Sequence, residues 1–528
     1  MSVPTADQKV AVTIVGGGPV GIVAALLLIR SGLDVVVLER YPSMLAAPKA
    51  HLVSPRSLEI LDAAGVRLER LEALAPPRSR NTMAWYVDSL AGRAFGSRPY
   101  EPGAERGQFA ERLNIAQPLL ERELRERLRS VAPRALRTEH RWISSLTDDD
   151  AVVSEVVGPD GPYRLRSSYL IAADGAGSGI RESLGIRMQG PPPPDARATI
   201  HFEADLRELV DDRQGMLYFV ANPRTEGTLL AYDAASTWAY LCAPLDPKTA
   251  ETDAVEIIRA AIGADHPFQI RGISSWTVAA EVAERYTDGR TFLVGDAAHR
   301  FPPTGGLGLN TGLGDADNLT WKLSAVLQGR AAPALLDTYD SERRPVGEQN
   351  RDQSLANLVD LMQLYPAMLT YDEHRDDELL QHKIDRQLAA VNTIGLQLGY
   401  RYGGGKEITV LTHEPTAEVG DHVPAVRLAL GGGVRSLIDR NGFSLLVAPG
   451  SGVTWEAALA GSTPALRVFE VEPASEEDAW WPELLGLLPD GAVLVRPDAH
   501  IVGRYRSPAE SSRITAAMTD LLQPAPAR

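Results

Sequence analysis

The stretch from Val10 to Glu39 constrains the fold of this chain more than any other. It begins with a short apolar run rich in β-branched residues and turns at glycines in a G-x-G-x-x-G pattern. An apolar segment from Val20 to Ile29 follows, and a second apolar run, Asp34 to Leu38, ends at Glu39. This order predicts a strand, a glycine turn, a buried helix and a second strand.

Each glycine of this pattern has a separate physical role. Gly16 would allow the tight turn out of the strand, Gly18 would let the backbone approach a pyrophosphate, and Gly21 would let the helix pack close to the sheet. The helix N-terminus would then direct unpaired N–H groups and a partial positive charge at the phosphates. Glu39 could accept hydrogen bonds from an adenosine ribose. The stretch therefore predicts dinucleotide binding, and it does not separate FAD from NAD.

The composition is that of a globular protein with room for about two or three domains. The 528 residues include 53 basic and 69 acidic side chains, a net charge of −16, which argues against nucleic acid or an anionic membrane as a partner. The single cysteine, Cys242, permits no intramolecular disulfide, and we interpret it as a small buried residue. No signal peptide is evident before Lys9 and no apolar stretch is long enough to span a bilayer, so we expect a cytoplasmic protein.

A second glycine-rich segment, Gly295 to Asn310, follows a predicted buried strand. The strand would place Asp296 at its C-terminal end, where α/β sheets bind ligands, and Asp296 could accept a hydrogen bond from a ribityl hydroxyl. The glycines would let the backbone lie flat against a planar ring. Asn310 is a plausible N-cap for a helix from Thr311, and that helix would stabilise a reduced flavin with its positive end.

Three further features carry less information on their own. Asp174-Gly175 follows the predicted strand Tyr169 to Ala173, and the pair could equally be a turn with Asp174 as a cap. The segment Gln117 to Val131 is predicted to be an amphipathic helix whose charges form a solvated face. Lys49 and Gln117 could contact a cofactor, although each is more simply an ordinary surface residue.

Taken together, these motifs resemble the three fingerprints of the class A flavoprotein monooxygenases. That family comprises the single-component, FAD-dependent aromatic hydroxylases of the p-hydroxybenzoate hydroxylase and phenol hydroxylase type. The segment Leu335 to Pro345 is also similar to a recurrent stretch of the family, so the resemblance covers about residues 10 to 350. The stretch Val493 to Asp498 resembles the thioredoxin-like third domain of the larger phenol and aromatic-polyketide hydroxylases.

The resemblance implies a mixed α/β and α+β fold, in which a Rossmann-like FAD-binding domain is interleaved with an antiparallel-sheet substrate domain. We expect the FAD-binding domain to comprise residues 1–190 and 285–400, with some substrate-domain strands near 80–110. The substrate domain would comprise residues 191–284. A thioredoxin-like C-terminal domain, residues 401–528, would follow. It contains no cysteine, so a disulfide role is excluded, and packing or a subunit interface is expected.

The resemblance also implies roles for individual residues. Asp174 is linked in the family to both FAD and NAD(P)H, and Gln117 matches a glutamine that contacts the ribityl chain. Lys49 stands about where the family has an arginine near the flavin, a change that keeps the charge and loses the bidentate fork. The residues expected to bind the cofactor are Gly16, Gly18, Gly21, Glu39, Arg40, Lys49, Arg112, Gln117, Asp174, Gly295, Asp296, Pro303, Gly306, Gly308, Leu309 and Asn310.

The activity implied by the resemblance is that of an FAD-dependent, NAD(P)H-consuming monooxygenase. It would hydroxylate a phenolic or polycyclic, polyketide-like aromatic substrate with molecular oxygen, through a flavin C4a-hydroperoxide. NADPH or NADH would bind transiently, because the chain contains no second complete G-x-G-x-x-G motif. Baeyer–Villiger oxidation, epoxidation and a non-oxygenating flavin reductase or redox scaffold stay open as alternatives. The substrate, the position oxidised, the nicotinamide donor and the oligomeric state, of which a homodimer is one candidate, are not specified.

No catalytic acid or base can be assigned from the sequence. The candidates are His51, Tyr218, Tyr240 and His299, and the substrate pocket could also be lined by His201, Tyr232 and Trp276. Each of these residues is more simply part of the core or the surface. No His/Cys cluster has the spacing of a zinc site, so we expect no metal.

Overall fold

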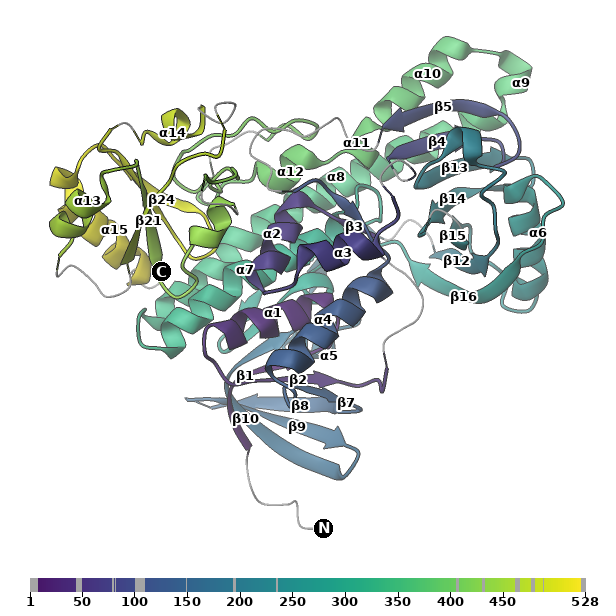
Figure 1. Ribbon diagram of the computed structural model, residues 1–528. Coiled ribbons are helices and arrows are strands. Elements are labelled where there is room, and N and C mark those ends of the chain that lie inside the picture. Colours follow the sequence, from purple (N-terminus) through teal and green to yellow (C-terminus); the bar gives the residue numbers. More distant parts are fainter. Residues whose placement is uncertain are drawn as a thin grey trace.

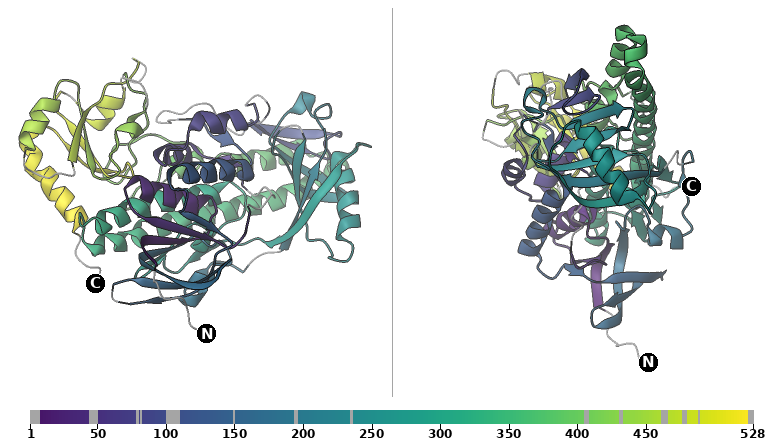
Figure 2. Two further views of the ribbon diagram at one scale, coloured as in Figure 1. Left: turned by 60° about the horizontal axis from the view of Figure 1, so that its bottom comes forward. Right: turned by 90° about the vertical axis from the view of Figure 1, so that its right-hand side faces the viewer.

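The chain builds three larger sheets around a central group of helices (Figure 1). The computed structural model describes residues 8–43, 50–77, 80, 82–99, 110–148, 150–192, 196–233, 236–404, 408–429, 433–460, 466–475, 480–487 and 489–523. A seven-stranded sheet and the four-stranded C-terminal sheet lie on opposite sides of these helices, as Figures 1 and 2 (left) both show. The predicted fold class, a mixed α/β and α+β protein, is confirmed.

An eight-stranded sheet contains the predicted strand–helix–strand unit. In its parallel part, β1 lies between β2 and β10, and β19 lies on the far side of β10. The β8–β9 hairpin is attached antiparallel to the first half of β10. The strands are β1 (Gln8–Val15), β2 (Val35–Glu39), β7 (Leu136–Thr138), β8 (Arg141–Thr147), β9 (Val152–Gly158), β10 (Gly161–Ala172), β18 (Thr287–Asp288) and β19 (Thr291–Leu293).

Three helices cover the parallel part of this sheet. α1 (Pro19–Arg30) is apolar almost throughout and packs between α4 (Gln117–Val131) and α7 (Leu307–Leu327). Gly312 permits the close approach of α7, because a Cβ atom there would lie 2.7 Å from Val20 Cγ2. α4 corrects one expectation: its charges do not all form a solvated face, because Arg125 is buried against the glycine turn.

The seven-stranded sheet is antiparallel except where β4 pairs with β13. One face packs against α6 (Ala250–Ile262), and the other packs against α8 (Thr338–Leu369) and α10 (Asp377–Arg386). Cys242 is a free cysteine buried on the α6 side, in agreement with the sequence-based interpretation. In spatial order the strands are β16 (Gln269–Thr277), β12 (Ala196–Glu203), β15 (Thr237–Cys242), β14 (Thr225–Ala231), β13 (Leu217–Asn222), β4 (Met83–Val87) and β5 (Ala94–Pro99).

The C-terminal sheet has the order β22-β21-β23-β24, with one parallel and two antiparallel pairs. Its elements are β21 (Phe443–Val447), α13 (Gly452–Ala458), β22 (Leu466–Glu470), α14 (Trp480–Leu485), β23 (Ala492–Val495), β24 (Ile501–Tyr505) and α15 (Ser511–Leu522). Smaller elements connect the three sheets. They are β3 (Leu52–Val53), α2 (Pro55–Ala63), α3 (Leu68–Leu74), β6 (Leu113–Asn114), α5 (Gly179–Ser183), β11 (Met188–Gln189), β17 (Glu281–Ala283), β20 (His299–Arg300), α9 (Tyr371–His374), α11 (Leu388–Val391) and α12 (Ile394–Leu398).

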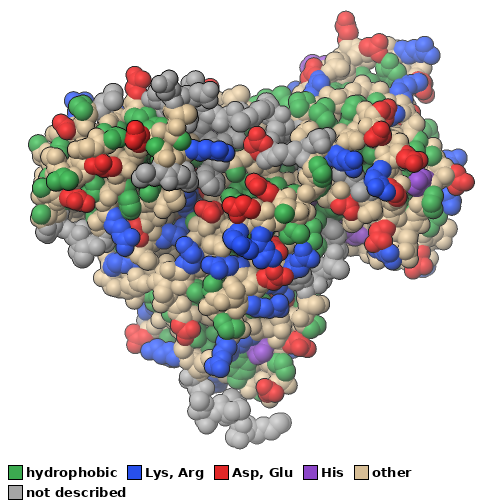
Figure 3. All heavy atoms as spheres, in the orientation of Figure 1, with side chains coloured by type: hydrophobic (Ala, Val, Ile, Leu, Met, Phe, Trp, Pro, Cys, Tyr) green, Lys and Arg blue, Asp and Glu red, His purple; other side chains and the backbone are tan. Residues whose placement is uncertain are grey.

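Two further features of the described residues concern membrane crossing and metal binding. Among the described residues, no helix has both the length and the apolar character needed to cross a bilayer. Within the same ranges, no group of three or more His, Cys, Asp or Glu side chains is arranged to hold a metal ion. On the face shown in Figure 3, basic and acidic side chains are interspersed.

Candidate active site

The carboxyl ends of four parallel strands lie level at one edge of the eight-stranded sheet. Val15 of β1 pairs with Leu38 of β2 and with Ala172 of β10, and Ala172 pairs with Leu293 of β19. The residues that follow these positions include Glu39, Gly16, Asp174 and Gly295. The register therefore brings the three sequence motifs to one edge, the position at which open α/β sheets bind ligands.

The first glycine turn has the geometry of a phosphate cradle. Gly16 has φ +111°, and a Cβ atom on Gly21 would lie 2.1 Å from the Gly16 carbonyl oxygen, so both positions require glycine. Gly18 instead faces open space, with no atom within 4 Å of an added Cβ. α1 begins at Pro19 and has no acidic residue in its first turn, so its positive end is available to a pyrophosphate.

Two side chains support this turn. Glu39 accepts hydrogen bonds from the backbone N–H of Gly17 and of Tyr41, both at 2.9 Å, and its carboxylate stays half-buried at the edge. The buried Arg125 of α4 donates to the Gly17 carbonyl at 3.0 Å. Arg125 could not be recognised from the sequence, because a single charge on an amphipathic helix gives no signal of burial. Arg40 lies beside the turn, with its guanidinium over the Tyr41 ring.

Asp174 has one carboxylate oxygen that is buried and has no hydrogen-bond partner among the described residues. Its other oxygen accepts the Ile180 N–H at 3.2 Å. Burial raises the pKa of Asp174 above its ordinary value. A buried acceptor without a donor is unfavourable unless a ligand supplies one, so Asp174 fits a site for a ligand hydroxyl or N–H. Asp296 lies nearby on a short 3-10 turn, where its side chain is exposed.

The glycine-rich loop, residues 295–306, leads into α7 earlier than the sequence predicts. α7 begins at Leu307, with Gly306 as its N-cap in the left-handed conformation at φ 63° and ψ 33°. Asn310 is therefore inside the first turn and is not the N-cap. The first turn of α7 contains no acidic residue, and a Cβ atom at Gly308 would face open space. A planar ring could approach this helix end closely. Negative charge on the ring would then lie near the N–H groups of the first turn of α7.

The remaining residues expected to bind the cofactor lie in or beside the glycine-rich loop, or on other elements of the chain. Pro303 is exposed and Leu309 is half-buried. Gln117 exchanges two 2.9 Å hydrogen bonds with the backbone of Ala50, so it fixes the chain just before β3. Arg112 donates to the Val391 carbonyl at 2.8 Å. Lys49 lies outside the described residues.

His51 and Tyr232 meet where β3 approaches the seven-stranded sheet. Their ring centroids are 6.0 Å apart in an edge-to-face arrangement. His51 Nδ1 lies 3.0 Å from Asn114 Oδ1. Burial lowers the pKa of His51 to about 4, so its imidazole is neutral at physiological pH. The residue as a whole is half-buried.

The other aromatic candidates lie away from this point. Tyr218 and Tyr240 belong to the core on the α6 side of the seven-stranded sheet, whereas Tyr232 belongs to the core on the opposite side. Their hydroxyls are occupied, one by the Arg213 carbonyl at 3.0 Å and the other by Thr225 at 2.9 Å. His201 and Trp276 lie on β12 and the neighbouring edge strand β16.

His299 is a fully buried residue of the glycine-rich loop. Its Nε2 lies 2.8 Å from Asp315 on α7, and its ring stacks on Phe301 at 4.8 Å. Asp315 also accepts the Gly295 N–H at 3.1 Å and a 2.9 Å hydrogen bond from Arg343 of α8. These contacts make His299 part of the framework of the loop. Asp315 and Arg343 were not among the site residues expected from the sequence.

The comparison with known proteins decides the family. Residues 9–354 match the family described as "FAD binding domain". The chain belongs to the FAD-dependent aromatic and polyketide monooxygenases. It is 34% identical to 4-methyl-5-nitrocatechol 5-monooxygenase of a Burkholderia species, an alignment that covers 98% of this chain and 97% of the relative. It is 31% identical to tetracenomycin B2 monooxygenase-dioxygenase of Streptomyces olivaceus, covering 95% of this chain and 96% of the relative.

Solved structures of this monooxygenase family extend the likeness to the whole chain. The flavin-dependent monooxygenase PieE, in complex with FAD and substrate, superposes with a TM-score of 0.90 at 30% identity and covers 98% of this chain and 100% of that one. Aklavinone-11 hydroxylase with FAD and aklavinone gives a TM-score of 0.81 at 27% identity, with the same coverage. This chain is therefore an FAD-dependent monooxygenase, and the family expected from its sequence motifs is confirmed.

Proposed function

We propose that this monooxygenase takes electrons from NADPH or NADH and inserts one oxygen atom of O₂ into the ring of a phenolic or polycyclic aromatic substrate. Several relatives are named for such molecules, including a nitrocatechol, a dichlorophenol and aromatic polyketides. Bound FAD would accept the hydride. It would also transfer the oxygen atom, by the hydroperoxide route that the resemblance implies.

The residues at the sheet edge fit FAD in this role. The open space over Gly18 and the positive end of α1 suit the pyrophosphate. Glu39 suits the adenosine ribose, and Asp174 with its unpartnered oxygen suits a hydroxyl or N–H of a nucleotide. The glycine-rich loop and the N-terminus of α7 suit the isoalloxazine. These assignments rest on geometry and charge together.

The observation that carries the substrate proposal is the edge-to-face contact between the rings of His51 and Tyr232. With the Asn114 carbonyl as acceptor, His51 Nδ1 carries the ring hydrogen and Nε2 keeps its lone pair. Nε2 can then accept a hydrogen bond from the hydroxyl of a phenol, which raises the electron density of the phenol ring. Tyr232 would offer an aromatic edge to the same substrate.

The test of the function is an anaerobic absorption experiment on the purified holoenzyme. NADPH or NADH is added with and without a test naphthol, and ¹⁸O₂ is then admitted. We expect bleaching of the flavin that the naphthol accelerates, and a product that carries one ¹⁸O atom. Reoxidation that yields only hydrogen peroxide with a panel of phenols would favour a flavin reductase. Oxygen found in a ring lactone or an epoxide would favour the alternative oxygenations.

The role of His51 is tested separately with His51→Gln. One hydrogen bond to the substrate hydroxyl contributes about 0.5–1.5 kcal/mol, so we expect kcat/KM for the phenol to fall by about two- to tenfold and to recover as pH rises and the phenol ionises by itself. The exposed His382 provides the control variant His382→Gln. An unchanged rate in His51→Gln at pH 7 would remove His51 from the mechanism.

A further inference from the structure

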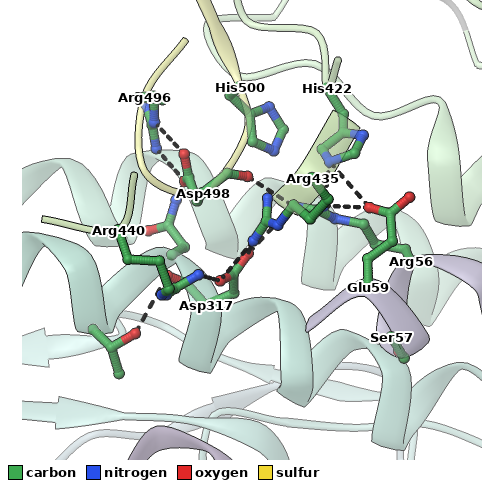
Figure 4. A network of polar contacts seen from close by, with 12 residues as sticks. Arg56, Ser57, Glu59, Asp317, His422, Arg435, Arg440, Arg496, Asp498 and His500 are labelled. Carbon is green, nitrogen blue, oxygen red and sulfur yellow. Dashed lines mark hydrogen bonds and ion pairs between the residues drawn. The ribbon is translucent and has the colours of Figure 1, made fainter. Parts of the chain in front are cut away.

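A buried set of charged side chains joins the C-terminal region to α2 and α7 (Figure 4). We call it the seam cluster, and it comprises Arg56, Glu59, Asp317, His422, Arg435, Arg440, Arg496, Asp498 and His500. Asp317 of α7 accepts hydrogen bonds from Arg440 at 2.7 Å, from Arg435 at 3.0 Å and from Arg56 at 3.3 Å. Buried charges that lose their partners are strongly destabilising, so the cluster holds the C-terminal region firmly in place.

The seam cluster continues towards the glycine-rich loop through Tyr402. The ring of Tyr402 stacks on His500, with centroids 4.1 Å apart and planes 27° apart. Its hydroxyl accepts a hydrogen bond from Arg343 Nη1 at 3.3 Å. Arg343 Nε donates to Asp315 at 2.9 Å, and Asp315 in turn holds the His299 ring at 2.8 Å. All of these side chains are buried.

Arg343 is the branching point of this chain of contacts. Besides Asp315 and Tyr402, it donates to the Thr311 carbonyl at 3.1 Å, which lies on α7 just after its first turn. Its guanidinium therefore links the glycine-rich loop, through Asp315, to the helix end proposed to face the flavin. The cation is fully buried, so each of its N–H groups needs an acceptor.

We propose that Tyr402 is a positioning residue through which the C-terminal region sets the geometry of the glycine-rich loop and the binding and reduction of FAD. Without the Tyr402 hydroxyl, the fully buried Arg343 loses the acceptor of its Nη1 group, and the guanidinium must turn to recover one. That turn loosens its bonds to Asp315 and Thr311. The loop and the positive end of α7 are then held less firmly against the flavin.

The inference rests on the proposed placement of the flavin at the N-terminus of α7, but its test needs neither the aromatic substrate nor NAD(P)H. The test variant is Tyr402→Phe, which removes one hydroxyl and keeps the stack on His500. We expect the dissociation constant of FAD to rise about tenfold, the effect of losing one hydrogen bond to a charged group. We also expect a more negative midpoint potential in a dithionite titration, because the end of α7 then stabilises reduced flavin less.

The matched control is Tyr400→Phe. The guanidinium of Arg343 lies over the Tyr400 ring at 5.3 Å, a contact that phenylalanine keeps, and the Tyr400 hydroxyl interacts with Arg56 in the seam cluster. We expect this variant to bind FAD and to titrate like the wild type. An unchanged potential in Tyr402→Phe, or an equal shift in both variants, would overturn the proposal.

A double-mutant cycle separates this positioning role from general packing. Arg343→Lys keeps the buried charge and loses the fork that bridges Tyr402, Thr311 and Asp315. If the two residues act in one chain of contacts, the combined variant should weaken FAD binding no more than Arg343→Lys alone. Additive losses would mean that Tyr402 and Arg343 act independently and would also overturn the proposal.

Discussion

Asn310 and Ser54 are 256 residues apart in the sequence, yet the Asn310 side-chain oxygen accepts the Ser54 backbone N–H at 2.9 Å. The same oxygen accepts the Ser57 hydroxyl at 2.7 Å, and the Asn310 amide donates to the Leu52 carbonyl at 3.1 Å. Asn310 thereby ties the start of α2 to the first turn of α7. The start of α2 is therefore held against the helix end proposed to face the flavin.

We expect Asn310→Ala to destabilise the protein by about 1–3 kcal/mol, because it leaves the buried Ser54 N–H and Ser57 hydroxyl without their acceptor. Urea unfolding of the cofactor-free protein measures this loss, and the variant should also retain less FAD after gel filtration. The exposed Asn441 supplies Asn441→Ala as the control. Equal unfolding midpoints for the two variants would show that the tether contributes nothing.

Gly18 and Gly21 should respond differently to the same substitution. A methyl group at Gly21 would meet the Gly16 carbonyl at 2.1 Å, whereas at Gly18 it enters the open space proposed for the pyrophosphate. We expect Gly21→Ala to lower the melting temperature strongly or to abolish folding. Gly18→Ala should fold normally and bind FAD weakly, as thermal unfolding and flavin fluorescence would report. Normal FAD binding by Gly18→Ala would place the pyrophosphate elsewhere.

Asp174→Asn should stabilise the cofactor-free protein at neutral pH. The folded protein raises the pKa of Asp174 through burial, so the protonated form is favoured by folding. That contribution is complete below the unfolded pKa of about 4 and is lost as pH rises through the raised pKa. The gain in unfolding free energy of the variant should therefore be largest above that pH. The variant should also bind FAD more weakly, because the unpartnered carboxylate oxygen is gone. The exposed Asp160 gives the control Asp160→Asn, in which neither change is expected.

The seam cluster should make stability depend on pH through His500. Burial lowers the pKa of His500 to about 3, so the unfolded chain binds its proton at a higher pH than the folded protein does. Stability is then complete above the unfolded pKa of about 6.5 and falls as pH falls towards the folded value. At pH 5 this single group costs on the order of 2 kcal/mol.

Urea unfolding at pH 7 and pH 5 tests this prediction with His500→Phe, which keeps an aromatic ring beside Tyr402. The difference in unfolding free energy between the two pH values should shrink in this variant relative to the wild type. His382→Phe, at an exposed position, should leave the difference as it is. A His500→Phe protein with the wild-type pH dependence would contradict the assignment.

The elements that carry the three motifs could be predicted because their signals are local. The first strand, helix and second strand were expected between Val10 and Glu39, and the structure has β1, α1 and β2 within two residues of that stretch. Runs of β-branched residues and glycines specify these elements without help from distant segments. The start of α7 was missed because its first turn contains Gly308, which lowers helix propensity, and its N-cap is a left-handed glycine that no pattern marks.

The buried polar framework could not be predicted, because its members are defined by distant partners. Arg343 lies 28 residues from Asp315, and Arg125 lies 108 residues from Gly17. In the sequence, such residues look like ordinary helical surface charges. For a related reason, the sequence could not show which of Tyr218, Tyr232 and Tyr240 lies nearest the proposed site. Alternation along a strand shows that a residue faces one side of a sheet, and it does not show which side faces the cofactor.

Asp315 and Asp317 are two positions apart on α7, which turns their side chains about 200° from each other. One carboxylate serves the glycine-rich loop, and the other receives the arginines of the seam cluster. Recombination between two such monooxygenases must therefore preserve the buried contact between α7 and the C-terminal region, which sequence identity does not reveal. A chimera joined after α12 would inherit Arg435, Arg440 and Arg496 from one parent, and Arg56 and Asp317 from the other. The acids and bases of the seam have to be exchanged as a single set, although they come from three separate parts of the chain.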